Sequence, residues 1–162
     1  MPRAGHPRPA DPVASPRRIE RMAAAPAELL AQIPLFEGLS QGELKRIAGS
    51  FKERRFSAGD TIAVEGASGV GFFVIGEGEA SVDVHGEPRG KLGPGNYFGE
   101  VALIDDEARR TATITADSNL TCYGITSWEF RPLVETNAQI AWKLLQVMAK
   151  RLRESEQQQI SI

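Results

Sequence analysis

Residues 97–113 read YFGEVALIDDEARRTAT, and this stretch combines features that no other part of the chain brings together. Gly95 and Gly99 bracket an aromatic pair, and residues 101–104 are expected to form one short helical turn. Arg109 and Arg110 then precede an alternating Thr/Ala run that is typical of a strand. A helical turn placed between strands predicts a binding loop, so the rest of the chain is interpreted outward from this segment.

The segment holds groups that suit a small anionic ligand with a sugar. Backbone N–H groups at the start of the turn attract an anion, and Gly99 allows a ligand to approach them without a Cβ in the way. The planar guanidinium of Arg110 offers paired hydrogen bonds to phosphate oxygens, and the carboxylate of Glu100 accepts one from a sugar hydroxyl. A cyclic nucleotide carries both a phosphate and a sugar hydroxyl, so it requires groups of this kind.

On either side of this segment, residues 51–126 contain short strand-forming runs separated by frequent glycines. The runs at 61–64, 72–75, 80–84, 111–116 and 120–125 are rich in β-branched and aromatic residues. Regular short strands with turn signals predict an antiparallel, jelly-roll-like β-roll. The predicted fold class is therefore mainly β with flanking helices.

Helical patterns precede and follow the roll. At residues 26–50, Pro34 ends a first helical piece, and Ser40 with Glu43 three positions later predicts a capping box for a second. At residues 127–156, Ser127 is expected to cap a helix over 128–136, and a longer helix is expected over 138–156. Residues 26–156 thus form one domain, and residues 157–162 are expected to be a tail.

Composition excludes several classes of protein. Hydrophobic content is 41%, charged content is 25% and the net charge is −2, so a nucleic-acid or membrane-surface binder is not indicated. Residues 1–21 are rich in Pro and Arg and are expected to be disordered. Because the sequence has neither a transmembrane run nor a secretory signal, a cytoplasmic location is expected.

The sequence shows no sign of catalysis. His6 and His85 are the only histidines, so a cupin-like metal enzyme, the nearest catalytic β-barrel alternative, lacks its ligands. Cys122 is the single cysteine and lies in an apolar run, where a core role is favoured over a nucleophilic one. We therefore predict a protein that is not an enzyme and holds no metal or cofactor.

The runs FGEVALI and RTAT closely resemble the phosphate-binding cassette of the cyclic nucleotide-binding domain family, which includes the catabolite activator protein and the regulatory subunits of cAMP-dependent kinase. LFEGLS at 35–40, FSAGDTI at 56–62 and GPGNYFGE at 93–100 extend the resemblance over about residues 34–152. Asn96 and Ala108 depart from the more usual Asp and Pro. Neither change removes a ligand contact.

The resemblance implies a role for each residue of the pocket. Glu100 would bind the ribose 2′-hydroxyl and Arg110 the cyclic phosphate, with Arg109 left as a surface charge. A structural salt bridge between Glu100 and Arg110 is the alternative. The other implied binding residues are Val82, Phe98, Gly99, Val101, Ala102, Thr111 and Ala112 in the roll, and Arg151, Ser155 and Glu156 on the last helix, where a solvated helix end is the competing interpretation for the last two.

The resemblance also implies a regulatory function. The ligand would reposition the C-terminal helices, and only QQQISI follows residue 156, too little for a DNA-binding domain. We therefore expect a stand-alone sensor that signals to an unknown effector protein in trans, unless the chain is part of a longer product. A nucleotide-insensitive interaction module with the same fold is the alternative.

The most detailed expectations concern which cyclic nucleotide binds and whether the chain forms a homodimer. Thr111 follows the phosphate-binding arginine, where a hydroxyl can bond either the guanine amino group of cGMP or the phosphate. Bacterial family members with Ser or Thr there commonly respond to cAMP, and the Ala-, Gly- and Arg-rich composition favours such a source. We therefore expect cAMP, with a cGMP-selective sensor as the alternative, and a homodimer through the 138–156 helix.

Overall fold

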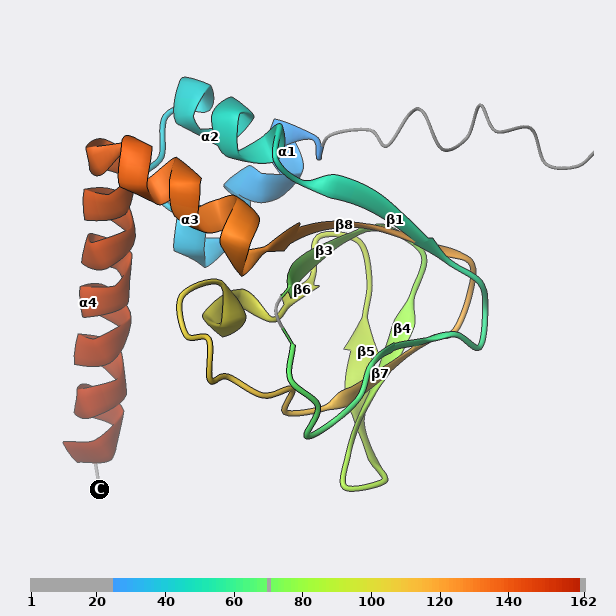
Figure 1. Cartoon of the computed structure of the whole chain (residues 1–162). Helices are drawn as coiled ribbons and strands as arrows, with labels where there is room; N and C mark the ends of the chain where they lie inside the picture. The colour runs from blue at the N-terminus through green and yellow to red at the C-terminus, as the bar shows by residue number, and fades with distance from the viewer. Residues whose placement is uncertain (1–24, 70, 161–162) are drawn as a thin grey trace, which may run out of the picture.

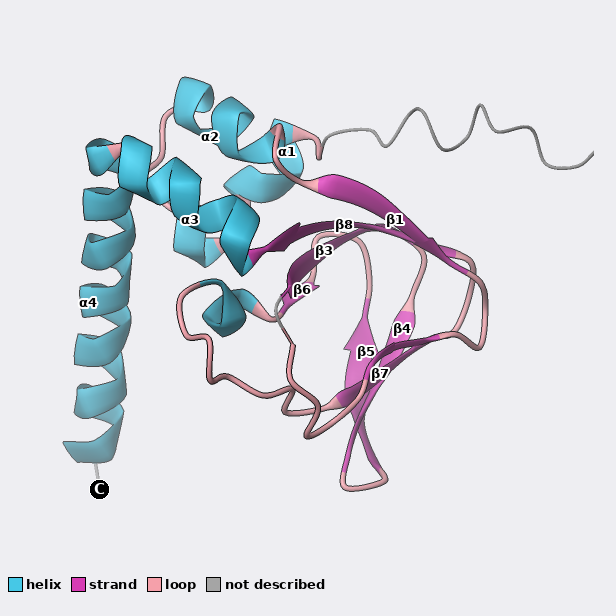
Figure 2. Cartoon of the chain, viewed as in Figure 1, coloured by secondary structure: helices cyan, strands magenta, loops and turns pink. Residues whose placement is uncertain are grey.

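The computed structural model describes residues 25–69 and 71–160, and of residues 159 and 160 only the backbone. It confirms the predicted fold class, because two four-stranded antiparallel sheets form a roll that is flanked by helices (Figures 1 and 2). One sheet has the order β1-β8-β3-β6 and the other β2-β7-β4-β5. The prediction for residues 1–21 lies outside the described residues.

The strands are β1 (Lys52–Phe56), β2 (Thr61–Ala63), β3 (Gly71–Glu77), β4 (Ala80–Val84), β5 (Glu87–Leu92), β6 (Tyr97–Phe98), β7 (Thr113–Ala116) and β8 (Leu120–Thr126). The sequence did not indicate β1, β5 or β6, and all three lie at sheet edges. Edge strands bury little side-chain surface, so β1 and β5 carry charged residues instead of an apolar alternation, while β6 is only two residues long. The strand expected over 111–116 starts at Thr113, which leaves Thr111 and Ala112 in the preceding loop.

The hydrophobic core has two parts. Phe72 of β3 is fully buried at the centre of the first, where its ring meets Phe36, Phe51 and Tyr97 edge to face. This part joins the helices to the β1-β8-β3-β6 sheet. The second part lies inside the roll and includes Cys122. Burial raises the pKa of the Cys122 thiol to about 12, so this cysteine is a protonated core residue.

Three short helical segments precede the roll: α1 (Ala27–Ala31), the 3₁₀ turn η2 (Pro34–Phe36) and α2 (Gln41–Ala48). The capping box predicted for α2 is present. The Ser40 hydroxyl accepts a hydrogen bond from the Glu43 N–H at 3.2 Å, and the Ser40 N–H donates to the Glu43 carboxylate at 2.9 Å. A hydrogen bond from Lys143 is the largest of the effects that lower the pKa of Glu43 to about 2, so α2 is also tied to the last helix.

Two helices follow the roll, α3 (Ser127–Thr136) and α4 (Ala138–Ile160). The prediction of Ser127 as the cap of α3 is wrong. Thr126 is the cap, and its N–H and hydroxyl both donate to the Glu129 carboxylate, at 3.2 and 2.7 Å. The predicted helix end at 156 and tail at 157–162 are also corrected, because the glutamines after 156 are good helix formers and α4 continues to Ile160.

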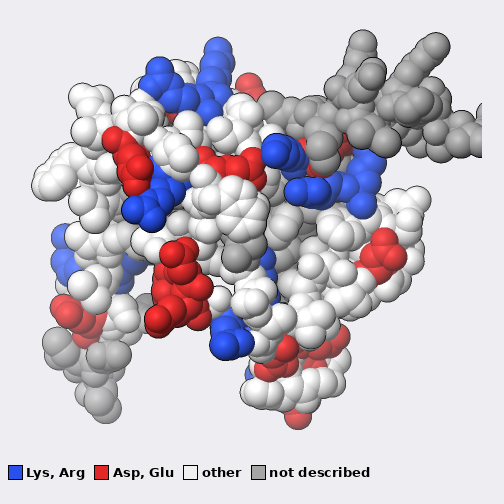
Figure 3. Space-filling view, viewed as in Figure 1, with Lys and Arg blue, Asp and Glu red and all other residues white. Residues whose placement is uncertain are grey.

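The last helix, α4, runs along one side of the molecule (Figure 1). Ile140, Leu144 and Val147 are buried against the rest of the protein. Trp142, Leu145 and Leu152 are exposed on α4. In the described part of the chain, no helix has the length and apolar character needed to cross a membrane. On the face drawn in Figure 3, Lys and Arg are interspersed with Asp and Glu.

Candidate ligand-binding site

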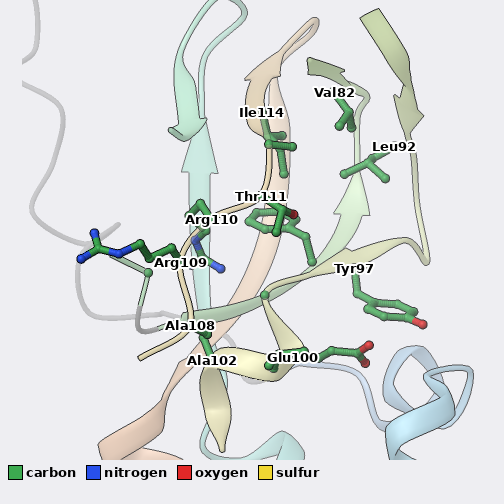
Figure 4. Close-up of a pocket in the computed structure, with 15 residues that line it drawn as sticks. Val82, Leu92, Tyr97, Glu100, Ala102, Ala108, Arg109, Arg110, Thr111 and Ile114 are labelled. Atoms are coloured by element: carbon green, nitrogen blue, oxygen red, sulfur yellow. The ribbon is translucent and has the colours of Figure 1, made fainter. Parts of the chain in front are cut away.

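A cavity of about 350 Å³ borders the 3₁₀ turn η3 (Glu100–Leu103). This volume falls within the range of about 300–1,000 Å³ that is usual for small-molecule sites. Figure 4 shows its wall, which strands β4 to β7, η3 and the loop after η3 build together. The lining residues are Gly69, Val82, Leu92, Tyr97, Phe98, Gly99, Glu100, Val101, Ala102, Ala108, Arg109, Arg110, Thr111, Ala112 and Ile114.

The half-buried guanidinium of Arg110 is held in a fixed position in this wall. Its Nη2 donates a hydrogen bond of 2.7 Å to the Gly71 carbonyl oxygen. Its central carbon lies 5.8 Å from the centre of the Phe73 ring and 5.6 Å from that of Phe98, both within the range of cation–π contacts. Burial lowers the pKa of Arg110, but an arginine stays protonated in a protein. The wall therefore carries a partly desolvated positive charge.

Two glycines make room for Arg110. A Cβ on either Gly69 or Gly99 would overlap the Arg110 guanidinium. Gly99 also has a φ of +84°, a left-handed conformation that favours glycine, and it directly precedes η3. The backbone therefore approaches the arginine closely at two positions. The first N–H groups of η3 have no carbonyl partner within the turn, which makes them suitable donors to an anion.

The carboxylate of Glu100 pairs with α4. Arg151 Nη1 lies 3.0 Å from Glu100 Oε1, and Nη2 lies 3.4 Å from Oε2. The alternative of a structural Glu100–Arg110 salt bridge is therefore wrong, because Arg110 donates to the Gly71 carbonyl instead. The hydrogen bond with Glu100 is the main cause that raises the pKa of Arg151.

The two adjacent arginines differ in their surroundings. The Arg109 side chain is exposed and points away from the cavity, whereas Arg110 points into its wall (Figure 4). Arg109 donates a hydrogen bond of 3.2 Å to the Gly66 carbonyl oxygen. The assignment of Arg110 to the phosphate accords with this geometry.

The structure brings most of the predicted binding residues together. Arg151 reaches the site through its ion pair with Glu100. Ser155 and Glu156 do not line the cavity and are exposed on α4, since the helix carries them about a turn beyond Arg151. The residues that line the cavity as predicted are Val82, Phe98, Gly99, Glu100, Val101, Ala102, Arg110, Thr111 and Ala112.

Sequence reasoning missed several lining residues. Leu92 and Ile114 add apolar surface beside Val82, and Ile114 could have been found because it lies in a predicted strand. Tyr97 lies within the segment of residues 97–113, but its sequence context assigns it no role in binding. The sequence around Gly69 does not indicate a role in the site, because its importance comes from contact with an arginine far along the chain. Within the described ranges, no three His, Cys, Asp or Glu residues are grouped as a metal site.

Comparison with known protein families gives one match that covers about half of the chain. The model of the cyclic nucleotide-binding domain matches residues 53–137. A "cAMP-dependent protein kinase regulatory subunit" from Mycosarcoma maydis is 41% identical over 93 residues, which are 55% of this chain and 18% of the relative. A "cGMP-dependent protein kinase" from Plasmodium berghei is 31% identical over 107 residues, 66% of this chain and 12% of the relative. The chain thus spans less than a fifth of each kinase protein.

Among solved structures, the chain is similar to the N-terminal domain of a transcriptional regulator from Streptomyces coelicolor. The TM-score is 0.74 and the sequence identity 27%, and the match covers 78% of this chain and 94% of that domain. The similarity therefore extends over nearly the whole of the solved domain. It agrees with the roll and flanking helices described above.

Proposed function

Because this chain belongs to the cyclic nucleotide-binding domain family, we propose that it binds cAMP in the cavity around Arg110 and signals to a partner protein in the cytoplasm by moving α3 and α4. The role is regulatory and not catalytic, and binding involves no metal or cofactor. One observation carries the proposal. A partly desolvated arginine, positioned by two rings and two glycines, lines a cavity whose volume is usual for a small-molecule site.

Each part of the nucleotide has a matching part of the cavity. Arg110 and the N–H groups at the start of η3 receive the cyclic phosphate, where a paired, charge-assisted contact is strongest. Glu100 accepts the hydrogen bond of the ribose 2′-hydroxyl. The apolar side chains of Val82, Leu92 and Ile114 cover the base. Thr111 and Ala112 complete the phosphate end from the loop.

The effect of nucleotide binding is expected to reach the C-terminal helices through the residues of η3 that pack against α3. Leu103 of η3 is buried in the same core as Phe130 of α3. Leu103 and Ile104 also line a second hollow together with Trp128 and Val134 of α3. A shift of η3 on nucleotide binding therefore repacks α3, and α4 follows it after Asn137.

Calorimetric titration tests the proposal directly. We expect saturable binding of cAMP by the purified, nucleotide-free protein with a Kd in the micromolar range or below. A folded protein that gives no heat with either cAMP or cGMP would contradict the proposal. That result would favour the alternative function, an interaction module that keeps the fold without binding a nucleotide.

Selectivity between the two nucleotides depends on Thr111. One relative is named for cAMP and one for cGMP, and the apolar base end of the cavity offers little that distinguishes the two bases. A single neutral hydrogen bond contributes only about 1 kcal/mol. Thr111→Ala is therefore expected to leave cAMP affinity within a few-fold while cGMP affinity falls further, as competition titrations will show. One hydroxyl hydrogen bond, at ~1 kcal/mol, is too weak to produce a tenfold preference. If the wild type bound cGMP about tenfold or more tightly than cAMP, the choice of cAMP would be wrong.

We also propose that the protein forms a homodimer through α4. Trp142 is 63% exposed, Leu145 60% and Leu152 62%, so the outer surface of α4 leaves large apolar side chains uncovered. Light scattering at high micromolar concentration is expected to give a dimeric mass that Leu145→Glu reduces to that of a monomer. A monomeric mass for the wild type, with and without nucleotide, would contradict the dimer.

A further inference from the structure

We propose that Phe73 is a positioning residue for the phosphate end of the cavity, where its ring orients the Arg110 guanidinium before any ligand binds; this inference rests on the proposed function. Phe73 is half-buried and packs on the part of the core inside the roll. It is not among the residues that line the cavity, whereas Arg110 is. Any effect of Phe73 on the phosphate of a ligand therefore passes through the arginine.

The position of the Phe73 ring is set by its neighbours in the β1-β8-β3-β6 sheet. Phe73 of β3 is in register with Phe98 of β6 on one side and with Gly124 of β8 on the other. Residues that lie opposite each other in neighbouring strands present their side chains on the same face of a sheet. The two rings are stacked, with centres 5.3 Å apart and planes at 25°. One row across the sheet thus holds two rings beside a position without a side chain.

Two glycines make room for the Phe73 ring. A Cβ on Gly124 would lie 2.6 Å from Phe73 Cε1, and one on Gly71 would lie 2.9 Å from Phe73 Cε2, both closer than real Cβ atoms approach. Glycine weakens the interior of a strand, and it often marks a place where another group approaches the backbone closely. Gly71 and Gly124 therefore have a role in the phosphate site, since they admit the ring to the place from which it contacts Arg110.

The guanidinium of Arg110 contacts both rings of the stacked pair. Its central carbon lies at nearly the same distance from the two ring centres, 5.8 Å for Phe73 and 5.6 Å for Phe98. Its Nη2 also donates to the carbonyl oxygen of Gly71, which precedes Phe73 by two positions on the same strand. β3 therefore holds the guanidinium by two contacts, one through its backbone and one through a ring.

These partners leave the charge of Arg110 available to an anion. Among the residues that the structure describes, no carboxylate forms an ion pair with Arg110. A carboxylate would also order the side chain, but it would compete with a phosphate for the same N–H donors. An aromatic ring attracts the cation through its π face and uses none of those donors. The rings thus order the arginine without neutralising it.

Stepwise fluorination of the Phe73 ring tests this role, because fluorine withdraws the π-electron density that attracts a cation and changes the shape of the ring little. Phenylalanine with one, two or three ring fluorines is incorporated at position 73 only, and binding of cAMP and cGMP is measured by calorimetry. We expect the affinity to fall at each step, to about fivefold below the wild type with three fluorines. The same series at Phe72, the preceding residue of β3, is expected to leave binding unchanged, because Phe72 is buried in the other part of the core.

Two further comparisons separate positioning from packing. Phe73→Leu is expected to weaken cAMP binding about fivefold in the wild type and to have little effect in Arg110→Ala, where the guanidinium is absent. Gly124→Ala is expected to displace the Phe73 ring and weaken cAMP binding. Gly93→Ala is its control, since a Cβ there meets nothing within 4 Å. Circular dichroism establishes that each variant is folded.

Unchanged affinity through the fluorinated series at Phe73 would overturn the inference. An equal loss from Phe73→Leu with and without Arg110 would also overturn it, because the ring would then only fill space. If Phe73→Leu or Gly124→Ala does not fold, the fluorinated series decides, since it keeps the ring in place. A wild type that binds no cyclic nucleotide defeats the proposed function itself, whereas a wild type that binds and is insensitive to fluorination at Phe73 defeats this inference alone.

Discussion

Arg110→Ala is expected to weaken cyclic nucleotide binding by about 2 kcal/mol or more, roughly 30-fold, because a charge-assisted contact to phosphate is lost in a poorly solvated site. The wild-type guanidinium is already positioned by the Gly71 carbonyl and by the Phe73 and Phe98 rings. Ligand binding therefore has little side-chain entropy to overcome at this position. Titration calorimetry of the variant against the wild type measures the loss.

The neighbouring arginine supplies a matched control. Arg109→Ala removes the same charge one position away, from an exposed side chain that points out of the cavity. We expect a loss of no more than a few-fold, because a solvent-screened charge contributes little. If Arg109→Ala proved the more damaging change, the phosphate would belong to Arg109, and the assignment of the cassette would be displaced by one residue.

Phe72→Ala is expected to lower the free energy of unfolding by about 3–5 kcal/mol, the usual cost of truncating a fully buried phenylalanine. Phe72 is 0% exposed, and its ring centre lies 6.1 Å from that of Phe36 and 5.9 Å from those of Phe51 and Tyr97. The substitution therefore leaves a cavity where the helices, β3 and β6 meet. Urea unfolding followed by circular dichroism measures the change.

Trp128→Ala is the control for that experiment, since it also removes a large aromatic ring but from a side chain that is 63% exposed. Exposed substitutions usually change stability by about 0.5 kcal/mol or less. Comparable losses for the two variants would show that the Phe72 cluster is not the centre of the core. Trp128→Ala also leaves the nucleotide cavity intact, because Trp128 is not among its lining residues.

The ligand-binding segment was predictable because its groups are close together in the sequence. Gly99, Glu100 and Arg110 lie within a dozen positions, so the chemistry of these groups and the resemblance of the segment to the family's cassette could both be assessed from the sequence. The roll was predictable for a similar reason, since the central strands bury apolar side chains and carry that pattern locally. The edge strands β1 and β5 were not, because their exposed, charged residues resemble those of loops.

Tertiary structure alone decided how those groups are held. The Arg110 guanidinium donates to a carbonyl oxygen 39 positions away, and Glu100 pairs with an arginine 51 positions away. It also decided that Ser155 and Glu156 stay outside the cavity, because the direction of α4 depends on how its buried face packs. Local spacing determines which groups a segment offers to a ligand. Which of them are ordered and desolvated depends on contacts between elements far apart in the chain.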